Sequence, residues 1–439
     1  MSVGINQRKP AITFFVIMFV FGLLSIFVTF PLSNGDEGFH LSVVYNMFSA
    51  NHPEAMSEEA LREIEMVATS LPKNIDLGQL FSQKITAISA DGVALNILTD
   101  SNLISRIDIA HLPAALGALI GRFIYPSIGW ILVFSRLTNL LFFLISFYFI
   151  IKASKVGQWS LIMLFTVPFI QKLASPSYDV FCYVVVSFFI MMIFNLQQKL
   201  KFAEYTKREW LGLTTSLILL FFLKNNYLFA LPLLLALPSL HQPVLNWFKK
   251  LKKHQRSLLV ISGVLLIGIF LIVLHWQINL VELAKVFFTN YLNVETMGRR
   301  ARQLWQVTPL ILPNLLNILW LLCLFLVLLT GKKRRWFGAS QTISIGVFLL
   351  NWLGIFAGFY LLLNKQPFDD LSGRYISPFL ILFLPLLQNF GTKYELQLPE
   401  KVVKRISLSS TIIILVLYLI ICYYRGFVWG VTPTWTNLG

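Results

Sequence analysis

The sequence predicts an all-α polytopic membrane protein. Of its 439 residues, 56% are hydrophobic and only 13% are charged, and the mean hydropathy is +0.72. Apolar runs of membrane-spanning length recur along the chain. A soluble domain of this length does not need so much apolar surface, whereas a set of membrane-spanning helices does. We therefore expect one integral membrane domain over residues 1–439, without a separate soluble domain.

The first two full-length apolar runs set the expected orientation. Residues 11–30 are long enough to cross a bilayer and too long for the apolar part of a signal peptide. Basic residues precede this run and follow the run at 128–151, so both of those ends are expected in the cytoplasm. The two runs must then have opposite directions. The shorter run at 112–125 is accordingly expected to be a juxtamembrane or re-entrant helix rather than a crossing.

The later runs extend this topology to about 11 crossings, with the N-terminus inside and the C-terminus outside. They lie at residues 161–173, 180–196, 211–223, 227–240, 258–276, 310–330, 343–363, 376–390 and 408–424. Two of them, 211–223 and 227–240, are expected to be short crossings that meet at a polar turn rather than one long helix. Most of the 36 lysines and arginines fall on the inner side, so the net charge of +16 reflects membrane orientation rather than nucleic-acid binding.

Three polar segments are expected on the outer side, at residues 31–127, 277–306 and 364–375. The first is too long for a tight turn and contains a helical pattern at 57–68, so we expect outer juxtamembrane helices within it. The three cysteines lie in separate apolar runs and predict neither a disulfide framework nor a metal cluster.

Ionisable residues at or just below the predicted outer surface are the candidate functional groups. A charge at membrane depth costs roughly 2.5–3.5 kcal/mol on insertion scales, so it usually faces a cavity or a partner. Carboxylates can act as general bases, while lysine and arginine can hold phosphate. Together they suit a reaction in which a hydroxyl loses a proton and a phosphate leaves. The candidates are Asp36, Glu37, His40, Asp179, Lys224, Arg299, Arg300, Arg302 and Arg374.

Each candidate also has a structural interpretation. The acidic pair could be a polar helix end, and Asp179 could cap the helix that follows it. Lys224 could extend its ammonium group to water from a helix turn, and Arg374 could be an interfacial anchor. The arginines at 299–302 could form a solvated loop face. The histidines His40 and His111 are more readily explained by packing than by metal binding.

Three motifs carry a resemblance to a known group of proteins. They are Asp36-Glu37-Gly38-Phe39-His40, Ser175-Pro176-Ser177-Tyr178-Asp179 and Gly373-Arg374-Tyr375-Ile376-Ser377-Pro378. A first span, an acidic pair at the outer face and a long outer loop resemble the GT-C glycosyltransferases. The motifs resemble landmarks of a bacterial family of predicted membrane proteins of unknown function that is placed near GT-C. That family usually has two prolines before the acidic pair, where this chain has Asn34-Gly35.

The resemblance implies a GT-C-like fold and an inverting transfer of a sugar from a polyprenyl-phosphate donor. The acceptor would be a cell-envelope glycan or polymer, such as a wall polysaccharide or teichoic acid, on the outer face of the cell membrane. Asp36 would be the general base, and Glu37 would orient the acceptor or a divalent cation such as Mg²⁺ or Mn²⁺. The donor phosphate would be held by Lys224, Arg374, Arg299, Arg300 and Arg302. Substrate contacts are expected from His40, Asp179, Tyr178 and Tyr375.

Two other classes of function stay open at this point. A transporter or lipid-linked glycan flippase could use the same charges as a pathway through the membrane. Against this class, the sequence has no paired halves, and its polar residues are concentrated in one loop after the first span. A non-catalytic subunit of an envelope polysaccharide assembly is the other alternative, but it would have no need of an acidic pair at the membrane surface.

Overall fold

The computed structural model describes residues 3–33, 37–51, 75–95, 106–223, 225–291, 314–332, 334–362 and 375–430. Within these ranges the regular secondary structure is helical, as the sequence predicts. Four helices of the described part are long and apolar enough to cross a membrane, and one bent pair could form a fifth span. They are Arg8–Val28, Ile128–Ala153, Ser340–Leu362 and Glu400–Val428, with the bent pair Asn225–Ala236 and Pro238–Lys250. A helical membrane protein is therefore confirmed, while the count of 11 crossings stays a prediction.

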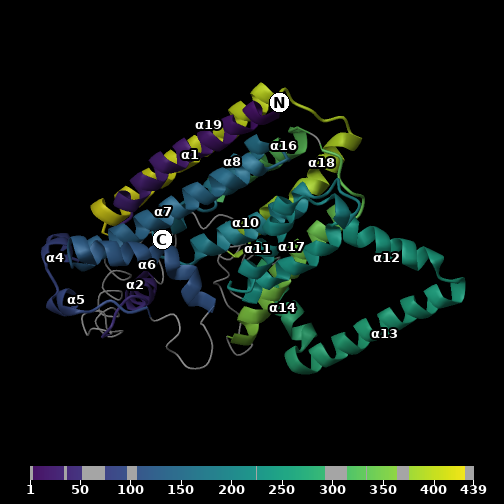
Figure 1. The fold of residues 1–439 in the computed structure, drawn as a ribbon, viewed down its shortest axis with the longest axis horizontal. Coiled ribbons are helices and arrows are strands. Elements are labelled where there is room, and N and C mark those ends of the chain that lie inside the picture. The colour runs from purple at the N-terminus through teal and green to yellow at the C-terminus, as the bar shows by residue number, and fades with distance from the viewer. Residues whose placement is uncertain are drawn as a thin grey trace.

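The first two long helices, α1 (Val3–Val28) and α7 (Ile128–Ala153), pack antiparallel. Near the start of α1, the Phe14 ring lies 5.9 Å from the Phe147 ring near the end of α7. Near the end of α1, the Ile26 carbonyl accepts a hydrogen bond of 3.0 Å from Arg136 near the start of α7. Residue numbers therefore rise along one helix as they fall along the other, which confirms the expected opposite directions. Figure 1 shows α19 (Glu400–Tyr423) alongside α1.

The helix α6 (Arg106–Ile124) folds back along the first half of α7. A Cβ atom built on Gly117 would lie 2.2 Å from the Phe134 carbonyl oxygen, so the two backbones approach closely there. The expected short helix at 112–125 thus exists but begins earlier, at Arg106, and continues through Pro113. The expectation that this helix does not cross the membrane stays a prediction.

The described part of the 31–127 segment forms a helical cap on this end of α7. The cap consists of α2 (Glu37–Asn46), α4 (Leu77–Ser82), α5 (Thr86–Ala90) and α6. Its apolar residues form a hydrophobic cluster of their own, which includes Leu41, Val44 and Ile88. The helical pattern at 57–68 lies outside the described residues. Helices in this segment are therefore confirmed, while their position at the membrane surface stays a prediction.

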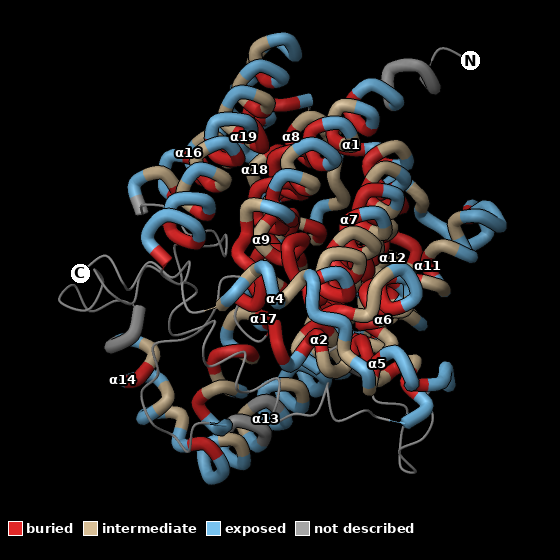
Figure 2. Tube along the Cα trace, turned by 90° about the vertical axis from the view of Figure 1, so that its left-hand side faces the viewer, coloured by how far each residue is buried: buried red, intermediate tan, exposed pale blue. Residues whose placement is uncertain are grey.

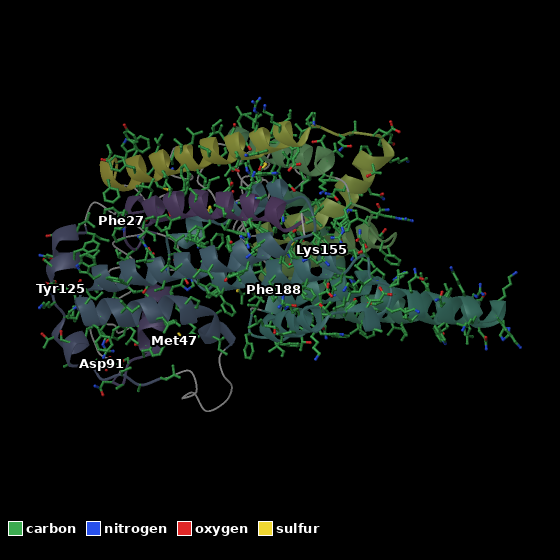
Figure 3. The ribbon with its side chains drawn as sticks, turned by 45° about the horizontal axis from the view of Figure 1, so that its top comes forward. Phe27, Met47, Asp91, Tyr125, Lys155 and Phe188 are labelled. Atoms are coloured by element: carbon green, nitrogen blue, oxygen red, sulfur yellow. The ribbon has the colours of Figure 1, made fainter. Side chains whose placement is uncertain are left out.

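A buried ion pair joins α6 to the residues that follow α5 in this cap. Arg122 on α6 lies 3.3 Å from Asp91, and it also donates to the Gly92 carbonyl at 2.9 Å. The Tyr45 hydroxyl donates to Asp91 at 2.8 Å. Burial by itself would raise the pKa of Asp91. The hydrogen bonds that the carboxylate accepts from Ser49, Tyr45 and the Asn51 N–H, together with the charge of Arg122, outweigh burial and lower this pKa. Figure 3 shows Met47, Asp91 and Tyr125 together at this end and Lys155 away from them.

The predicted run at 161–173 is not one helix. It forms α8 (Gln158–Thr166) and the short α9 (Ile170–Leu173), with a break at residues 167–169. Pro168 lies in this break and cannot donate the backbone hydrogen bond that would continue α8. The chain then turns into α10 (Asp179–Asn195), which lies in the centre of the bundle. Figure 2 shows buried segments concentrated around α7, α8 and α9.

The next two apolar runs fold back on each other, as the sequence predicts. They form α11 (Lys207–Leu220) and a 3₁₀ helix, η4 (Asn225–Ala236). The hydroxyls of Tyr205, just before α11, and Ser239, just after η4, lie 2.6 Å apart. The start of one run therefore meets the end of the other, which excludes a single long helix over both. The turn at residues 221–223 accordingly lies at the opposite end of this hairpin.

After the hairpin, α12 (Pro238–Lys250) bends away from η4 by 63°. Figure 1 shows α12 and α13 (Lys253–Ile278) projecting from the bundle before α14 (Leu280–Tyr291) returns to it. The side chains of α13 are largely exposed, with Leu258 at 68% and Trp276 at 80%. The run at 258–276 is one continuous helix, while its crossing of the membrane stays a prediction.

The remaining helices complete the bundle. They are α14 (Leu280–Tyr291), α16 (Asn314–Thr330), α17 (Ser340–Leu362), η6 (Ser377–Phe383) and α18 (Leu384–Lys393). The predicted run at 376–390 is thus divided into a 3₁₀ helix and an α-helix. Each of the two segments has a proline in its first turn, Pro378 and Pro385, and proline favours a new helix start at these positions.

Candidate functional site

Two of the three sequence motifs meet at one end of the bundle. His40 from the first motif lies edge-on to Tyr178 from the second, with 5.0 Å between the ring centroids. Both rings also contact His111 of α6, whose Nε2 lies 2.9 Å from Nδ1 of His40. These three side chains are at most 7% exposed. One aromatic and hydrogen-bonded cluster, formed by His40, His111 and Tyr178, therefore joins α2, α6 and the turn before α10. We call this cluster the motif junction.

The two histidines share a hydrogen bond, so one ring nitrogen donates and the other accepts. The accepting nitrogen must be unprotonated, which means that at least one of the two imidazoles is neutral. The expectation that His40 is explained by packing is therefore incomplete, because its ring also has a specific polar partner. No function is predicted for His111 from the sequence. The two histidines are 71 residues apart in the sequence, and no local pattern indicates that their side chains meet.

Glu37 is held by an arginine that the sequence analysis did not single out. Arg136 donates from Nε and Nη2 to the two carboxylate oxygens of Glu37 at 3.0 and 2.9 Å, and neither side chain is more than 1% exposed. Nη1 of the same guanidinium donates to the carbonyls of Ile26 and Thr29 at 3.0 and 3.1 Å. Arg136 thus ties the end of α1 and the start of α2 to α7. It fixes the backbone on both sides of residues 34–36.

Arg136 could have been found from the sequence. It is a charged residue inside the apolar run at 128–151, and such a residue is a functional or structural candidate by default. Asn139, one helical turn later, donates from Nδ2 to the carbonyls of Ser175 and Ser177 at 3.1 and 3.2 Å. Polar residues at i and i+3 on one face of α7 therefore position the first and second motifs together.

Asp179 does not cap α10, so the structural interpretation of this residue as a helix cap is wrong. It is the first residue of the helix, Tyr178 occupies the cap position, and no side chain caps this end. The N–H of Asp179 donates to Oγ of Ser177 at 3.2 Å. The carboxylate is completely buried. A negative charge in the first turn is favoured by the helix dipole, so this position accommodates Asp179 without a capping role.

The third motif reaches the same end of the bundle through Tyr227. Phe379, just after this motif, stacks on the Tyr227 ring at a centroid distance of 6.2 Å, and both η4 and η6 pack against α10, which begins at Asp179. Asn351 of α17 donates from Nδ2 to the Tyr375 carbonyl at 3.4 Å. Tyr227 follows the turn between α11 and η4 directly. The second motif, the third motif and this turn therefore meet around one buried tyrosine.

Several of the predicted site residues lie outside the described residues. They are Asp36, Lys224, Arg299, Arg300, Arg302 and Arg374. Three of them directly adjoin described residues of this region: Asp36 precedes Glu37, Lys224 precedes Asn225 and Arg374 precedes Tyr375. The arginines at 299–302 have no such described neighbour.

The described residues do not form a metal site. None of their histidine, cysteine, aspartate and glutamate side chains gather in a group of three or more that could hold an ion. Glu37 was the ligand expected if a divalent cation is bound, and both of its carboxylate oxygens accept hydrogen bonds from Arg136.

The arrangement can place charge in an environment from which water is largely excluded. The polar side chains of the motif junction are buried, and charges interact more strongly there than in water. Neither a family model, nor a curated protein, nor a solved structure matches this chain.

Proposed function

We propose that this protein is a glycosyltransferase of the GT-C type, which transfers a sugar from a polyprenyl-phosphate donor to a cell-envelope glycan or polymer. One observation carries the proposal. Three polar motifs, more than a hundred residues apart in sequence, converge at the end of the bundle where the first span ends. A fold that needed only to cross the membrane would have no reason to bury so many polar groups at one depth.

The proposed reaction forms one glycosidic bond and breaks one sugar–phosphate bond. Asp36 takes the proton of the acceptor hydroxyl as its oxygen attacks the anomeric carbon. The electron pair of the broken carbon–oxygen bond leaves with the lipid phosphate. Lys224 and Arg374 hold that phosphate as its charge develops, and the arginines at 299–302 are further candidates for this role. Attack opposite to the leaving phosphate inverts the anomeric centre.

Glu37 takes a positioning role in this proposal. Its carboxylate is engaged by Arg136 on both oxygens, so it fixes the backbone that carries Asp36 rather than contacting the acceptor. Tyr178, His40, Asp179 and Tyr375 form the buried wall beside the reacting groups, and those nearest the surface would contact the substrates. The active site would lie on the outer face of the cell membrane, with the N-terminus in the cytoplasm.

The general base provides the most direct test. A positioned base typically contributes about 10²–10⁴-fold to the rate. Asp36→Asn keeps size and hydrogen bonding but removes basicity, and it should lower single-turnover sugar transfer by that factor at saturating donor. Asp100→Asn, in the same polar segment, is the matched control and should keep the wild-type rate. Transfer is followed by the mass of the acceptor glycan, with polyprenyl-phosphate sugars as donors.

The same experiment separates the alternatives. A flippase would move the lipid-linked sugar between leaflets of a vesicle without changing its mass, and Asp36→Asn would then affect movement rather than transfer. A non-catalytic subunit would show neither activity alone. The contradicting result is a wild-type transfer rate in Asp36→Asn together with loss of transfer in Glu37→Gln at unchanged thermal stability. Glu37 would then be the base, and the assignment of Asp36 to that role would be wrong.

A further inference from the structure

A polar cavity lies at the other end of α7, away from the motif junction. Its larger compartment has a volume of about 610 Å³ and lies between residues 154–160, the chain that follows α16, and the start of α19. A smaller compartment of about 100 Å³ adjoins it, because residues 155–157 and Lys332 line both. We call the two compartments together the basal cavity. The positive-inside rule places this face in the cytoplasm.

The smaller compartment is strongly basic. Lys155, Lys332 and Arg334 line it, and its lining contains no carboxylate. The larger compartment is lined by one carboxylate, Glu400, which accepts a hydrogen bond of 3.1 Å from Nε1 of Trp159. Three cations around so small a volume repel one another unless an anion is present. This arrangement favours a doubly charged or polyoxygen anion over a neutral ligand.

One acid outside the lining contacts these cations. Glu209 lies 3.3 Å from Nζ of Lys155, and it also pairs with Lys199 and bonds Thr206. Its charge is therefore shared between two lysines. Lys155 keeps 47% of its side chain exposed and is free to turn toward the cavity. The cavity thus retains an excess of positive charge after this pair is counted.

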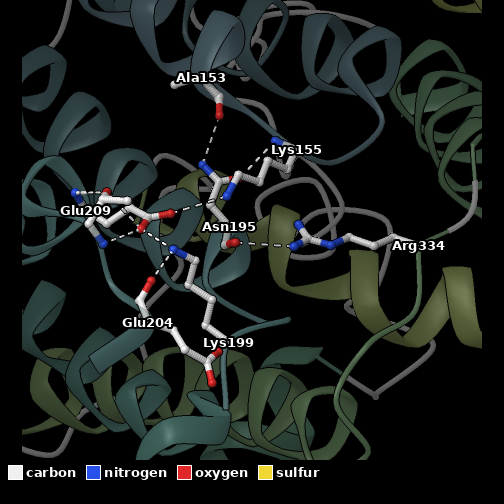
Figure 4. A network of polar contacts seen from close by, with 8 residues as sticks. Ala153, Lys155, Asn195, Lys199, Glu204, Glu209 and Arg334 are labelled. Carbon is white, nitrogen blue, oxygen red and sulfur yellow. Dashed lines mark hydrogen bonds and ion pairs between the residues drawn. The ribbon is translucent and has the colours of Figure 1, made fainter. Parts of the chain in front are cut away.

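A buried amide fixes two sides of the smaller compartment. Asn195 accepts from the Lys155 N–H at 2.8 Å through its Oδ1, and it donates from Nδ2 to the Ala153 carbonyl at 3.1 Å. Its own backbone carbonyl accepts from Nη2 of Arg334 at 3.3 Å. Figure 4 shows these contacts converging on Asn195 between Lys155 and Arg334. One residue at the end of α10 therefore holds both the backbone of Lys155 and the guanidinium of Arg334.

A second buried amide fixes the third side. Gln388 of α18 is 1% exposed, donates from Nε2 to the Lys332 carbonyl at 3.0 Å and accepts from Nε1 of Trp336 at 2.9 Å. Arg334 lies over the Trp336 ring, and its buried Nη1 makes no hydrogen bond within the described part of the chain. Burial lowers the pKa of Arg334 to about 10, which leaves it charged at neutral pH. One donor of this cation is therefore unused.

The helix α8 begins among the residues that line the larger compartment. Gly157 is its N-cap residue and has no side chain to accept a hydrogen bond from the first turn. The first N–H groups of a helix have no partner within the helix, and they carry the positive end of its dipole. This helix start adds further donors for an anion to those of the three cations.

We propose that the basal cavity binds a phosphate-bearing ligand, with its phosphate between Lys155, Lys332 and Arg334. The phosphate belongs to the headgroup of an anionic membrane lipid. The cavity lies where α7, α16 and α19 end or begin, which is the depth of lipid headgroups if these helices span the bilayer. Lys404 lies 4.8 Å over the Trp159 ring beside the cavity, and such a pair is typical of the membrane interface. This inference does not depend on glycosyl transfer.

Lipid binding can be measured directly on the purified protein. The full-length chain in nanodiscs of phosphatidylcholine with phosphatidylglycerol is analysed by native mass spectrometry for retained phosphatidylglycerol. The double variant Lys332→Gln with Arg334→Gln should retain it about tenfold more weakly, since two charge-assisted hydrogen-bond donors are removed. The matched control is Lys401→Gln, which removes an exposed charge at the start of α19 that does not line the cavity.

Three outcomes decide the proposal. Selective loss in the double variant, with unchanged thermal stability, supports it. Equal losses in the double variant and in Lys401→Gln would show that diffuse surface charge attracts the lipid, and would overturn it. Inorganic phosphate alone is the third arm of the test. If it displaces the bound lipid, and if it raises the unfolding temperature of the wild type but not that of the double variant, the phosphate site is supported. The ligand of this site is then a soluble phosphate rather than a lipid headgroup. An additional variant, Asn195→Ala, should weaken binding without removing any charge.

Discussion

Gly117 of α6 lies so close to Phe134 of α7 that a Cβ atom at residue 117 would come within 2.2 Å of the Phe134 carbonyl oxygen. Neighbouring Gly121 makes a similar approach, where a Cβ would come within 2.9 Å of the Trp130 carbonyl oxygen. Small residues allow two helix backbones to approach this closely, which increases their packing in a membrane. The seam joins the cap to the bundle.

Replacing Gly117 should therefore loosen the seam. Gly117→Ala should destabilise the protein by roughly 1–3 kcal/mol, because the added methyl group forces the two backbones apart. Gly346→Ala in α17 is the matched control, since a Cβ there would meet nothing within 4 Å and alanine is the better helix former. Thermal unfolding in detergent measures both. A Gly117→Ala variant at least as stable as Gly346→Ala would contradict the close approach.

The ion pair between Arg136 and Glu37 predicts a non-additive pair of mutations. Arg136→Met leaves a buried carboxylate without its guanidinium partner and should cost roughly 3–5 kcal/mol. The double variant Arg136→Met with Glu37→Met should recover much of this loss, because no uncompensated charge remains. Unfolding of both single variants and the double variant gives the coupling. Strictly additive losses would show that the two side chains do not act as a pair.

Glu209 should make the protein sensitive to acid. Burial raises the pKa of Glu209, but hydrogen bonds from Lys199, Thr206 and Lys155 outweigh burial and lower it to about 2. Because the pKa is lower in the folded state, the ionised carboxylate stabilises the fold near neutral pH, and this stabilisation is lost as the pH falls from 4.5 toward 2.

The measurement is the unfolding temperature as a function of pH. Glu209→Gln should be less stable than wild type at neutral pH and should lose less stability over the acidic range. Glu395→Gln, an exposed substitution on a loop of the same predicted face, should follow the wild-type curve. Parallel curves for wild type and Glu209→Gln would mean that this carboxylate contributes nothing to the acid response.

The topology also makes a definite prediction. Cysteine substituted for Glu65 should react with a membrane-impermeant reagent in intact cells, whereas cysteine substituted for Lys250 should react only after lysis. The three native cysteines lie in apolar helices and are buried or half-buried, so they should contribute little background labelling by a water-soluble reagent. The reverse pattern would invert the predicted orientation and place the motif junction on the cytoplasmic side.

The sequence predicts the arrangement of the first half of the bundle well, because the lengths of the apolar runs and the basic residues beside them together determine the direction of each helix there. Basic residues beside the runs at 11–30 and 128–151 require opposite directions, and Phe14 indeed packs on Phe147. The break in the run at 161–173 was missed, although Pro168 was a local signal for it. Runs of apolar residues indicate burial in lipid, but they do not by themselves fix where a helix bends.

The candidate site was predictable only where the signal is local. Glu37 and Asp179 stand out as acids near apolar runs, and Arg136 could have been found in the same way. The contact between His40 and His111 could not, because it depends on how α6 folds along α7. The same holds for Asn195 and Gln388, whose amides build the basal cavity. Their partners are backbone groups, and a sequence pattern does not show which backbone groups will be near.

The ion pair between Glu37 and Arg136 also has a consequence for the newly made chain. Its two members are separated by 99 residues, so Glu37 leaves the ribosome long before its partner is synthesised. At a synthesis rate of about 5–20 residues per second, that interval is roughly 5–20 seconds. During this time the first hydrophobic segment is inserted without the guanidinium that later holds its end. Final docking of the N-terminal helix must therefore await translation of α7, and maturation of the candidate site proceeds in that order.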